Sequence, residues 1–358
     1  MRALWAWVAA LVLACPASAA LVPAGAGLRA PAGIRADVFV TGLPRPTAFA
    51  LDSRGRLWAT SGSGVATRQD GVWLVARKGA RPRQIVRGVP TPLGLSWIGD
   101  ELFVAEKGRV RAYSRLAGTR FGRARTVRSG IPVGRHQNAG ITGGPDGRVY
   151  LGIGSPCDSC RPTSRVSATV VSFPPNGSDL RVVARGLRYA YGLAFLPGTA
   201  DLFATENGRD DLGLNQPPDE LNLIRAGRDY GYPGCWHQGG TPCRRKVPPV
   251  VRLAPHASAD GLSFVVDQWA RGTGRRRSSH SSARRFAPGP AATSSASPSG
   301  KGRAATPAGP APSRRDSSPR SPSRPDRTAP STWAISRAPR STGSAPAEQA
   351  RAIHQPCA

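Results

Sequence analysis

The chain has 358 residues, of which 50 are Lys or Arg and 21 are Asp or Glu, so its formal net charge at pH 7 is +29. It also contains 42 glycines and 35 prolines, and 39% of its residues are hydrophobic. This length can bury a large core, and so many turn-forming residues argue against a helical bundle and favour an all-β fold. The one long apolar stretch lies at the N-terminus, which excludes a polytopic membrane protein and leaves no membrane span in the mature chain.

Residues 1–19 are typical of an export signal. An arginine follows the first Met, an apolar run extends from Ala3 to Ala14, and Ala17-Ser18-Ala19 is a small-x-small cleavage site. Cys15 could instead be a lipobox cysteine, although the residues before it fit that motif poorly. We therefore expect a periplasmic or secreted protein whose mature chain starts with a linker over residues 20–35.

Residues 36–268 repeat one unit, in which a turn containing Gly precedes an apolar strand, a tight turn and a second strand. The units start at glycines 42, 88, 130 and 186, in steps of 46, 42 and 56 residues, and a fifth copy begins at His256. Short paired strands with a period in the forties are typical of β-propeller blades. A β-sandwich is the alternative, and the regularity of the repeat favours the propeller.

The strands expected from this repeat fall in pairs. The first strands are expected at residues 48–51, 93–96, 140–141 and 192–195, and the second at 57–60, 102–105, 149–151 and 202–205. The fifth copy contributes Gly261-Leu262-Ser263-Phe264 as a further first strand.

Residues 269–358 form a low-complexity basic tail without this repeat. Residues 271–358 hold 16 Lys or Arg and 3 Asp or Glu, with only Phe286 and Trp333 as aromatic residues. Such a tail lacks the stacking aromatics of a nucleic-acid site, so we expect no nucleic-acid partner. Two interpretations remain open, a disordered basic extension and a segment translated out of frame from a gene rich in G and C.

Two residues on loops before first strands are candidates for chemistry. His136 stands between glycines and amides in Gly134–Gly140, where a histidine facing a central channel could act as a general base. Arg188 follows Gly186-Leu187 and could offer a fixed positive fork to a carboxylate or a developing oxyanion. The alternatives are a histidine that only hydrogen-bonds its loop and an ordinary surface arginine.

The densest acidic region of the chain runs from Thr205 to Asp211 and continues through Pro217–Asn222 and Gly227–Pro233. Carboxylates, amides and backbone carbonyls are the hard oxygen donors that Ca²⁺ prefers. A solvated acidic loop is the alternative, and the alternating ligand spacing of an EF-hand is missing.

Four cysteines of the repeating region form two local pairs, Cys157 with Cys160 and Cys235 with Cys243. In an oxidising compartment two disulfides are expected. A zinc site with four thiolates is the alternative, although only the first pair has the short spacing of zinc ligands.

Several motifs, taken in order, resemble the soluble PQQ-dependent glucose/sorbosone (aldose sugar) dehydrogenase family. They are Gly88-x-Pro90-x-Pro92-x-Gly94-Leu95, Gly134-Arg135-His136-x-Asn138, Gly143 to Tyr150, Gly186-Leu187-Arg188 with Gly192 to Phe195, and Asp219 to Asn222 with Tyr230 to Pro233. The resemblance implies a six-bladed β-propeller with PQQ at the mouth of the central channel and Ca²⁺ beneath it. Only four to five blades can be read in this chain, because nothing in residues 271–358 matches the late blades.

The resemblance also assigns roles to individual residues. His136 matches the base that removes the sugar hydroxyl proton during hydride transfer, and Arg188 matches the arginine that stabilises the reduced quinone. Tyr189 stands beside the cofactor, where some family members have Asn. The calcium ligands implied by resemblance are Asn207, Gly208 and Arg209 for the activating ion, and Glu220 and Tyr230 for further ions.

The sequence therefore predicts an exported PQQ- and Ca²⁺-dependent sugar dehydrogenase that passes electrons to an unidentified acceptor. One alternative is a non-catalytic propeller that binds a sugar or a protein and has lost its cofactor site. A Ca²⁺-dependent propeller lactonase is another, which would use carboxylates rather than His136. Nicotinamide, nucleotide and serine-hydrolase functions have no supporting motif.

Overall fold

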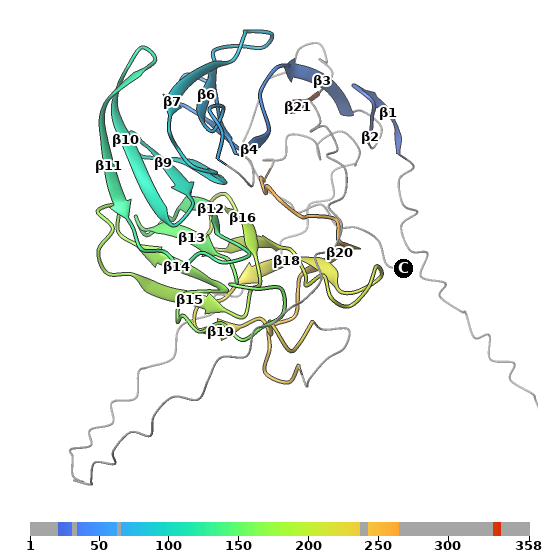
Figure 1. Ribbon diagram of the computed structural model, residues 1–358. Helices are drawn as coiled ribbons and strands as arrows, with labels where there is room; N and C mark the ends of the chain where they lie inside the picture. The colour runs from blue at the N-terminus through green and yellow to red at the C-terminus, as the bar shows by residue number, and fades with distance from the viewer. Residues whose placement is uncertain (1–20, 31–33, 63–65, 237–242, 265–331, 338–358) are drawn as a thin grey trace, which may run out of the picture. The chain divides into compact units, whose positions relative to one another are not determined.

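The computed structural model describes residues 21–30, 34–62, 66–236, 243–264 and 332–337. Every regular element in these ranges is a β-strand, which confirms the predicted all-β class (Figure 1). Within the same ranges, no helix has the length and apolar character needed to cross a membrane.

Four antiparallel sheets follow one another along the chain. In chain order their strands are β4 (Pro46–Leu51), β5 (Leu57–Ser61), β6 (Gly71–Val75) and β7 (Arg83–Arg87); β8 (Gly94–Ile98), β9 (Glu101–Glu106), β10 (Arg109–Ala117) and β11 (Arg120–Arg128); β12 (Asn138–Gly143), β13 (Val149–Ile153), β14 (Thr169–Phe173) and β15 (Arg181–Arg185); and β16 (Ala190–Phe195), β17 (Leu202–Glu206), β18 (Pro218–Ile224) and β20 (Val251–Pro255). A short strand, β19 (Arg228–Asp229), pairs in parallel with β15 and extends the third sheet.

The first strands of the four sheets are neighbours, since β4 contacts β8, β8 contacts β12 and β12 contacts β16. Together they line one cavity of about 870 Å³. Sheets that meet through their first strands around a common channel are the blades of a β-propeller, so the predicted architecture is confirmed. The described residues form four blades, and residues 265–331, where later blades of a six-bladed fold would fall, lie outside them.

A glycine near the start of three inner strands, β8, β12 and β16, lets neighbouring blades approach closely. A Cβ on Gly94 would lie 2.0 Å from Ala139 O, one on Gly140 would lie 2.4 Å from Tyr191 O, and one on Gly192 would lie 2.4 Å from Asp260 O. No side chain fits at these distances. The repeated glycine of the sequence is therefore a requirement of blade packing.

The predicted fifth copy of the repeat, residues 256–264, packs against the fourth blade although it forms no strand. Asp260 precedes Gly261 just as Tyr191 precedes Gly192, and its carbonyl packs on the preceding blade in the same way. Phe264 packs edge-on against Phe203 of β17, with ring centroids 5.2 Å apart. Residues 256–264 therefore start a fifth blade, even though their backbone lacks ladder partners in the described chain.

Apolar clusters fill the space between consecutive blades. Phe103 of β9 and Phe173 of β14 are fully buried in the cluster that joins the second and third blades. Trp58 centres the cluster between the first two blades, and Leu187 lies in the cluster between the third and fourth. Burial of each such side chain contributes about 1.5–3 kcal/mol, so blade stacking is a main source of stability.

Two small sheets lie outside the four blades. One is the hairpin of β1 (Val22–Gly25) and β2 (Leu28–Ala30). In the other, β3 (Ile34–Val40) pairs antiparallel with β21 (Thr332–Arg337), a strand for which the low-complexity composition of the tail gave no signal. The predictions of a disordered or out-of-frame tail otherwise concern residues outside the described ranges, as does the signal peptide at residues 1–19.

Candidate functional site

The loops that enter the third and fourth blades border a cavity of about 450 Å³. Five residues predicted from the sequence line it: His136, Arg188, Tyr189, Asn207 and Gly208. The other lining residues are Arg135, Tyr191, Asp210, Asp219, His256, Ser258 and Asp260. The structure thus brings together the predicted base, the predicted arginine and part of the predicted calcium loop, which are up to 72 positions apart in the chain.

His136 is held in one tautomer by Ser155. The Ser155 hydroxyl donates to Cys157 O at 2.6 Å, so its oxygen accepts the bond that links it to His136 Nδ1 at 2.9 Å. Nδ1 therefore carries the ring hydrogen, which leaves the lone pair on Nε2. Gly154 allows this arrangement, because a Cβ there would lie 2.4 Å from the Cβ of His136.

Its surroundings keep the His136 ring uncharged. Burial, with the Arg188 charge as a further cause, lowers the pKa of His136 from 6.5 to about 4. The ring also packs on Tyr189, with centroids 4.8 Å apart and planes inclined by 37°. At neutral pH His136 is a neutral base in a fixed orientation.

Arg188 is buried and its guanidinium is firmly held. Nε donates to Asp158 O at 3.1 Å and Nη1 donates to Asn207 O at 3.1 Å, while Nη2 bonds both Asp158 Oδ1 and Asp210 Oδ2. These bonds use four of the five guanidinium N–H groups among the described residues. Arg188 therefore supplies a fixed positive charge, as expected, which two aspartates partly neutralise.

Asp158 lies between the two cysteines of the first predicted pair. The structure joins Cys157 to Cys160 and Cys235 to Cys243 as disulfides, in agreement with the expected pairing. Asp158 also accepts the backbone N–H of Asp210 at 3.0 Å. Its hydrogen bonds and the Arg188 charge outweigh its partial burial and hold the pKa of Asp158 below its usual range. The first disulfide thus shapes the loop that positions Arg188.

Oxygen donors gather on the part of the cavity wall that contains Asn207. Asn207 Nδ2 donates to Ala259 O at 3.3 Å, which leaves the side-chain oxygen available. Asp219 accepts the backbone N–H groups of Gly208 and Ala259, and Asp260 lines the same cavity. Burial and the neighbouring Asp219 raise the pKa of Asp260. Amide and carboxylate oxygens that share a partly buried wall fit a hard cation such as Ca²⁺.

Arg209, Glu220 and Tyr230 do not line this cavity. Together with Gly208 they border a separate space of about 30 Å³. The Arg209 side chain is engaged elsewhere, with Asp211 Oδ1 at 2.5 Å and its guanidinium 5.5 Å from the centre of the Trp236 ring. The side chain of Arg209 is thus no part of a metal site, and only its backbone carbonyl could serve as the predicted ligand.

The small space borders a pair of buried carboxylates, Glu206 and Glu220, which face each other across β17 and β18. Asn222 Nδ2 donates to both, at 3.0 and 3.1 Å, while its buried side-chain oxygen has no hydrogen-bond partner in the described structure. Burial raises the pKa of Glu220 to about 7 and raises the pKa of Glu206 well above its usual range. These oxygens fit a cation, although no group of three or more His, Cys, Asp or Glu side chains in the described chain is close enough to bind a metal.

The cavity around His136, of about 450 Å³, also has features that suit PQQ, a flat tricarboxylic quinone. Its size falls within the range of about 300–1,000 Å³ that is usual for small-molecule sites. His136, Tyr189 and Tyr191 give it an aromatic wall, and Arg135 and Arg188 give it positive charge. The residues present therefore fit the cofactor on this side of the channel.

Six residues of the site were given no role from the sequence: Ser155, Asp158, Tyr191, His256, Ser258 and Asp260. Their contribution depends on contacts across blades. Arg188 and Asp158 are 30 positions apart, and the Asp260 carbonyl bonds Thr205 across 55 positions. Only the disulfide spacing around Asp158 could have drawn attention to one of them.

Residues 167–247 match the family model described as glucose/sorbosone dehydrogenase. The matched segment includes Arg188, Tyr189, the acidic loop and the second disulfide, and it ends before the fifth copy of the repeat. His136 lies outside it.

Solved structures that share the fold include an aldose sugar dehydrogenase and a carbohydrate-active enzyme. The PQQ-bound aldose sugar dehydrogenase from Streptomyces coelicolor is 25% identical with a TM-score of 0.53, over 64% of this chain and 75% of that one. The calcium structure of Carbohydrate-Active Enzymes Family AA12 from Trichoderma reesei is 18% identical with a TM-score of 0.57, over 69% and 75%. An uncharacterised protein of Borreliella burgdorferi is 20% identical over 66% of this chain and 67% of its own length.

These comparisons agree with the motifs from which the resemblance was inferred. The family match covers the motifs around Arg188 and Glu220, and the Streptomyces coelicolor structure extends the likeness to most of the propeller. The resemblance is therefore confirmed: this chain resembles the PQQ-dependent aldose sugar dehydrogenases of the glucose/sorbosone dehydrogenase family, which supports a sugar dehydrogenase.

Proposed function

We propose that this protein is an exported sugar dehydrogenase that depends on PQQ and Ca²⁺ and uses His136 as its base. The observation that carries the proposal is the state of His136, an uncharged ring with its Nε2 lone pair available beside a cavity with aromatic and cationic walls. The likeness to a PQQ-bound aldose sugar dehydrogenase supports the same activity.

The cofactors would be held by different parts of the wall. Tyr189, His136 and Arg188 would border the quinone, and Asn207 with the backbone of Gly208 and Arg209 would bind the activating Ca²⁺. Glu220 and Tyr230 would border a further Ca²⁺. When bound, PQQ supplies an acceptor for two electrons, and Ca²⁺ makes it a stronger one by polarising its oxygens.

His136 performs the proton transfer of the reaction. Oxidation of an aldose at its hemiacetal carbon would release a hydride, which the bound quinone would accept, and the hydroxyl proton, which Nε2 would accept, so the sugar would become a lactone and the imidazole would be protonated. Ser155 keeps the ring in place throughout, because Nδ1–H remains bonded to its hydroxyl oxygen. A positioned general base of this kind contributes about 10²–10⁴-fold in rate.

Arg188 supplies positive charge at a fixed distance from His136. Its guanidinium is bonded to Asp158, Asp210 and Asn207, so it does not need to reorganise when charge develops nearby. Such preorganised charge stabilises a developing anion more than a mobile side chain does. The same charge disfavours protonation of His136 before substrate arrives.

Export and electron transfer complete the proposal. An oxidising compartment is consistent with two disulfides in the described chain and with the export signal in the sequence. The electrons would leave through an acceptor that remains unidentified, and a soluble dye can replace it in the assay.

Reconstitution tests the proposal. Purified full-length protein should bleach the dye only when PQQ, Ca²⁺ and an aldose are all present, and omission of any one should abolish the signal. Equilibrium binding of PQQ without turnover of any aldose would favour a non-catalytic binding propeller. Hydrolysis of a lactone with Ca²⁺ alone would favour a lactonase, and either result would overturn the dehydrogenase.

A further inference from the structure

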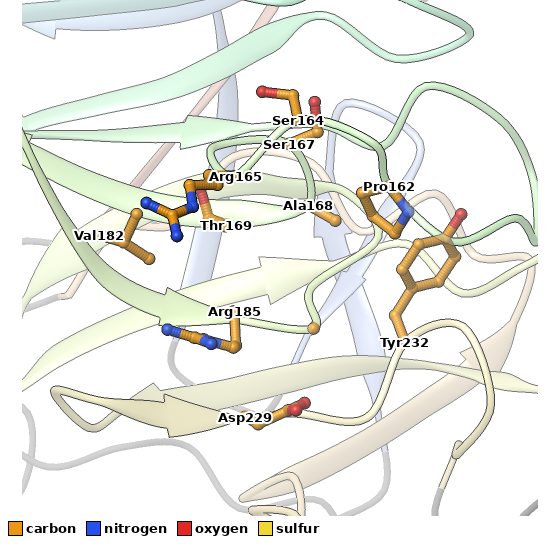
Figure 2. Close-up of a pocket in the computed structure, with 11 residues that line it drawn as sticks. Pro162, Ser164, Arg165, Ser167, Ala168, Thr169, Val182, Arg185, Asp229 and Tyr232 are labelled. Carbon is orange, nitrogen blue, oxygen red and sulfur yellow. The ribbon is translucent and has the colours of Figure 1, made fainter. Parts of the chain in front are cut away.

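A second cavity, of 490 Å³, lies between the loop before β14 and the strand β15 (Figure 2). It shares no lining residue with the cavity around His136. Arg165 comes from the loop, and Arg185 is the last residue of β15. In Figure 2 both guanidinium groups extend toward the side of the view on which Val182 lies.

The guanidinium groups of the two arginines have no side-chain partner among the described residues. Arg165 and Arg185 are exposed, and neither guanidinium group makes a hydrogen bond or an ion pair with another described residue. Arg181, four residues before Arg185, contrasts with them because it is paired with Asp179 at 2.6 Å. Two free guanidinium groups at one cavity are suited to an anion with two or more oxygens, such as a carboxylate.

One carboxylate, Asp229, also lines the cavity, and its charge is already compensated. Lys246 Nζ lies 2.6 Å from Asp229 Oδ2, and the backbone N–H of Gly231 donates to Oδ1 at 2.9 Å. Asp229 is next to Arg185 in the register of β15 and β19. With its two oxygens occupied, Asp229 does not cancel the positive charge of the arginines.

Hydroxyl groups add a second kind of recognition. Ser164 Oγ accepts the N–H of Val166 at 3.4 Å, so its own hydrogen is free to donate. Thr169 Oγ1 donates to Val166 O at 2.6 Å, so it can accept. Pro162, Ala168 and the ring of Tyr232 provide apolar surface beside these groups. A ligand with several hydroxyl groups on a carbon chain would match this lining.

We propose that this cavity binds a sugar acid, that is, a polyhydroxy carboxylate, with its carboxylate on Arg165 and Arg185 and its hydroxyls on Ser164 and Thr169. The identity of the acid rests on the proposed function, because the lactone formed by oxidation of an aldose takes up water to give an acid of this class. The cavity is linked to His136 by hydrogen bonds. Tyr232, which lines the cavity, donates to Cys157 O at 3.1 Å, and Ser155, the partner of His136, donates to the same oxygen.

Calorimetric titration of the full chain with gluconate tests the site, in the absence of PQQ and of any electron acceptor. Binding should weaken about tenfold or more when Arg165→Ala and Arg185→Ala are combined, because two charge-assisted contacts are lost. The control is Arg123→Ala combined with Arg181→Ala, which removes the same charge at exposed positions outside the cavity. The control should bind gluconate like the unmodified chain.

The outcomes separate this proposal from non-specific attraction to a protein of charge +29. Equal weakening in both double variants, or equal affinity for gluconate and acetate, would overturn it. Glucose serves as the neutral probe and should not bind at this site. Because PQQ is absent, gluconate binding can hold even if sugar oxidation fails, and sugar oxidation can hold even if gluconate does not bind.

Discussion

His136 shows how a single side chain is prepared by its neighbours. Ser155 orients its ring and Tyr189 packs on it. Burial and the charge of Arg188 lower its pKa. A histidine with the ordinary pKa of 6.5 would be partly charged in slightly acidic media, whereas this one is neutral. The cost is lower basicity, which the fixed geometry offsets by presenting Nε2 without reorganisation.

The depressed pKa predicts an unusual pH profile. The acid limb of kcat/KM, measured with reconstituted enzyme, should have its midpoint near the His136 pKa of about 4 rather than near 6.5. The same shift affects folding. Because the folded pKa lies below the unfolded one, stability contributed at neutral pH is lost as pH falls from 6.5 towards 4. Circular dichroism over this range identifies any loss of fold, and an acid limb near 6.5 with the fold intact would contradict the assignment.

The glycines that start the inner strands determine how blades meet. We expect Gly192→Ala to lower the free energy of unfolding by about 1–3 kcal/mol, because its Cβ would lie 2.4 Å from the backbone oxygen of Asp260. Gly261→Ala is the matched control, since nothing lies within 4 Å of a Cβ there. Denaturant unfolding of both variants checks this. Equal stability of the two would show that Asp260 does not pack against the fourth blade.

Much of the blade pattern could be predicted from the sequence. The expected first strand at residues 192–195 falls within β16, and the expected second strand at 202–205 falls within β17, because Gly-Leu-Ala-Phe and Leu-Phe-Ala-Thr are short apolar runs separated by a turn. The outer strands were not predicted. In β11 arginines occupy four of the nine positions, so the apolar alternation that marks a strand is lost.

The site was predicted in part for a similar reason. His136 and Arg188 stand in short local motifs and could be identified from their own segments as a candidate base and a candidate cation, and the resemblance made these roles specific to a quinone. Asp158 and Ser155 act through partners that only the folded chain brings near them. The fixed fork expected of Arg188 is present, but the sequence did not indicate that two aspartates from distant loops bind it.

At the scale of the whole molecule, the described chain combines four stacked blades with the start of a fifth. The candidate site is built from the loops of the third and fourth blades and from residues 256–260. It therefore depends on correct stacking at the end of the described propeller. The strong positive charge of the chain, +29, attracts anions without specificity, so anion binding is compared between variants of equal charge.

The central claim is that His136 is the base of a PQQ-dependent sugar oxidation. The most direct measurement compares dye reduction and PQQ binding in the unmodified chain and in His136→Ala, both supplied with Ca²⁺. The account predicts that turnover falls at least about hundredfold in the variant, while the dissociation constant of PQQ, measured by absorbance titration, stays within about threefold because its other contacts remain. Turnover retained in His136→Ala, with PQQ bound, would contradict the account.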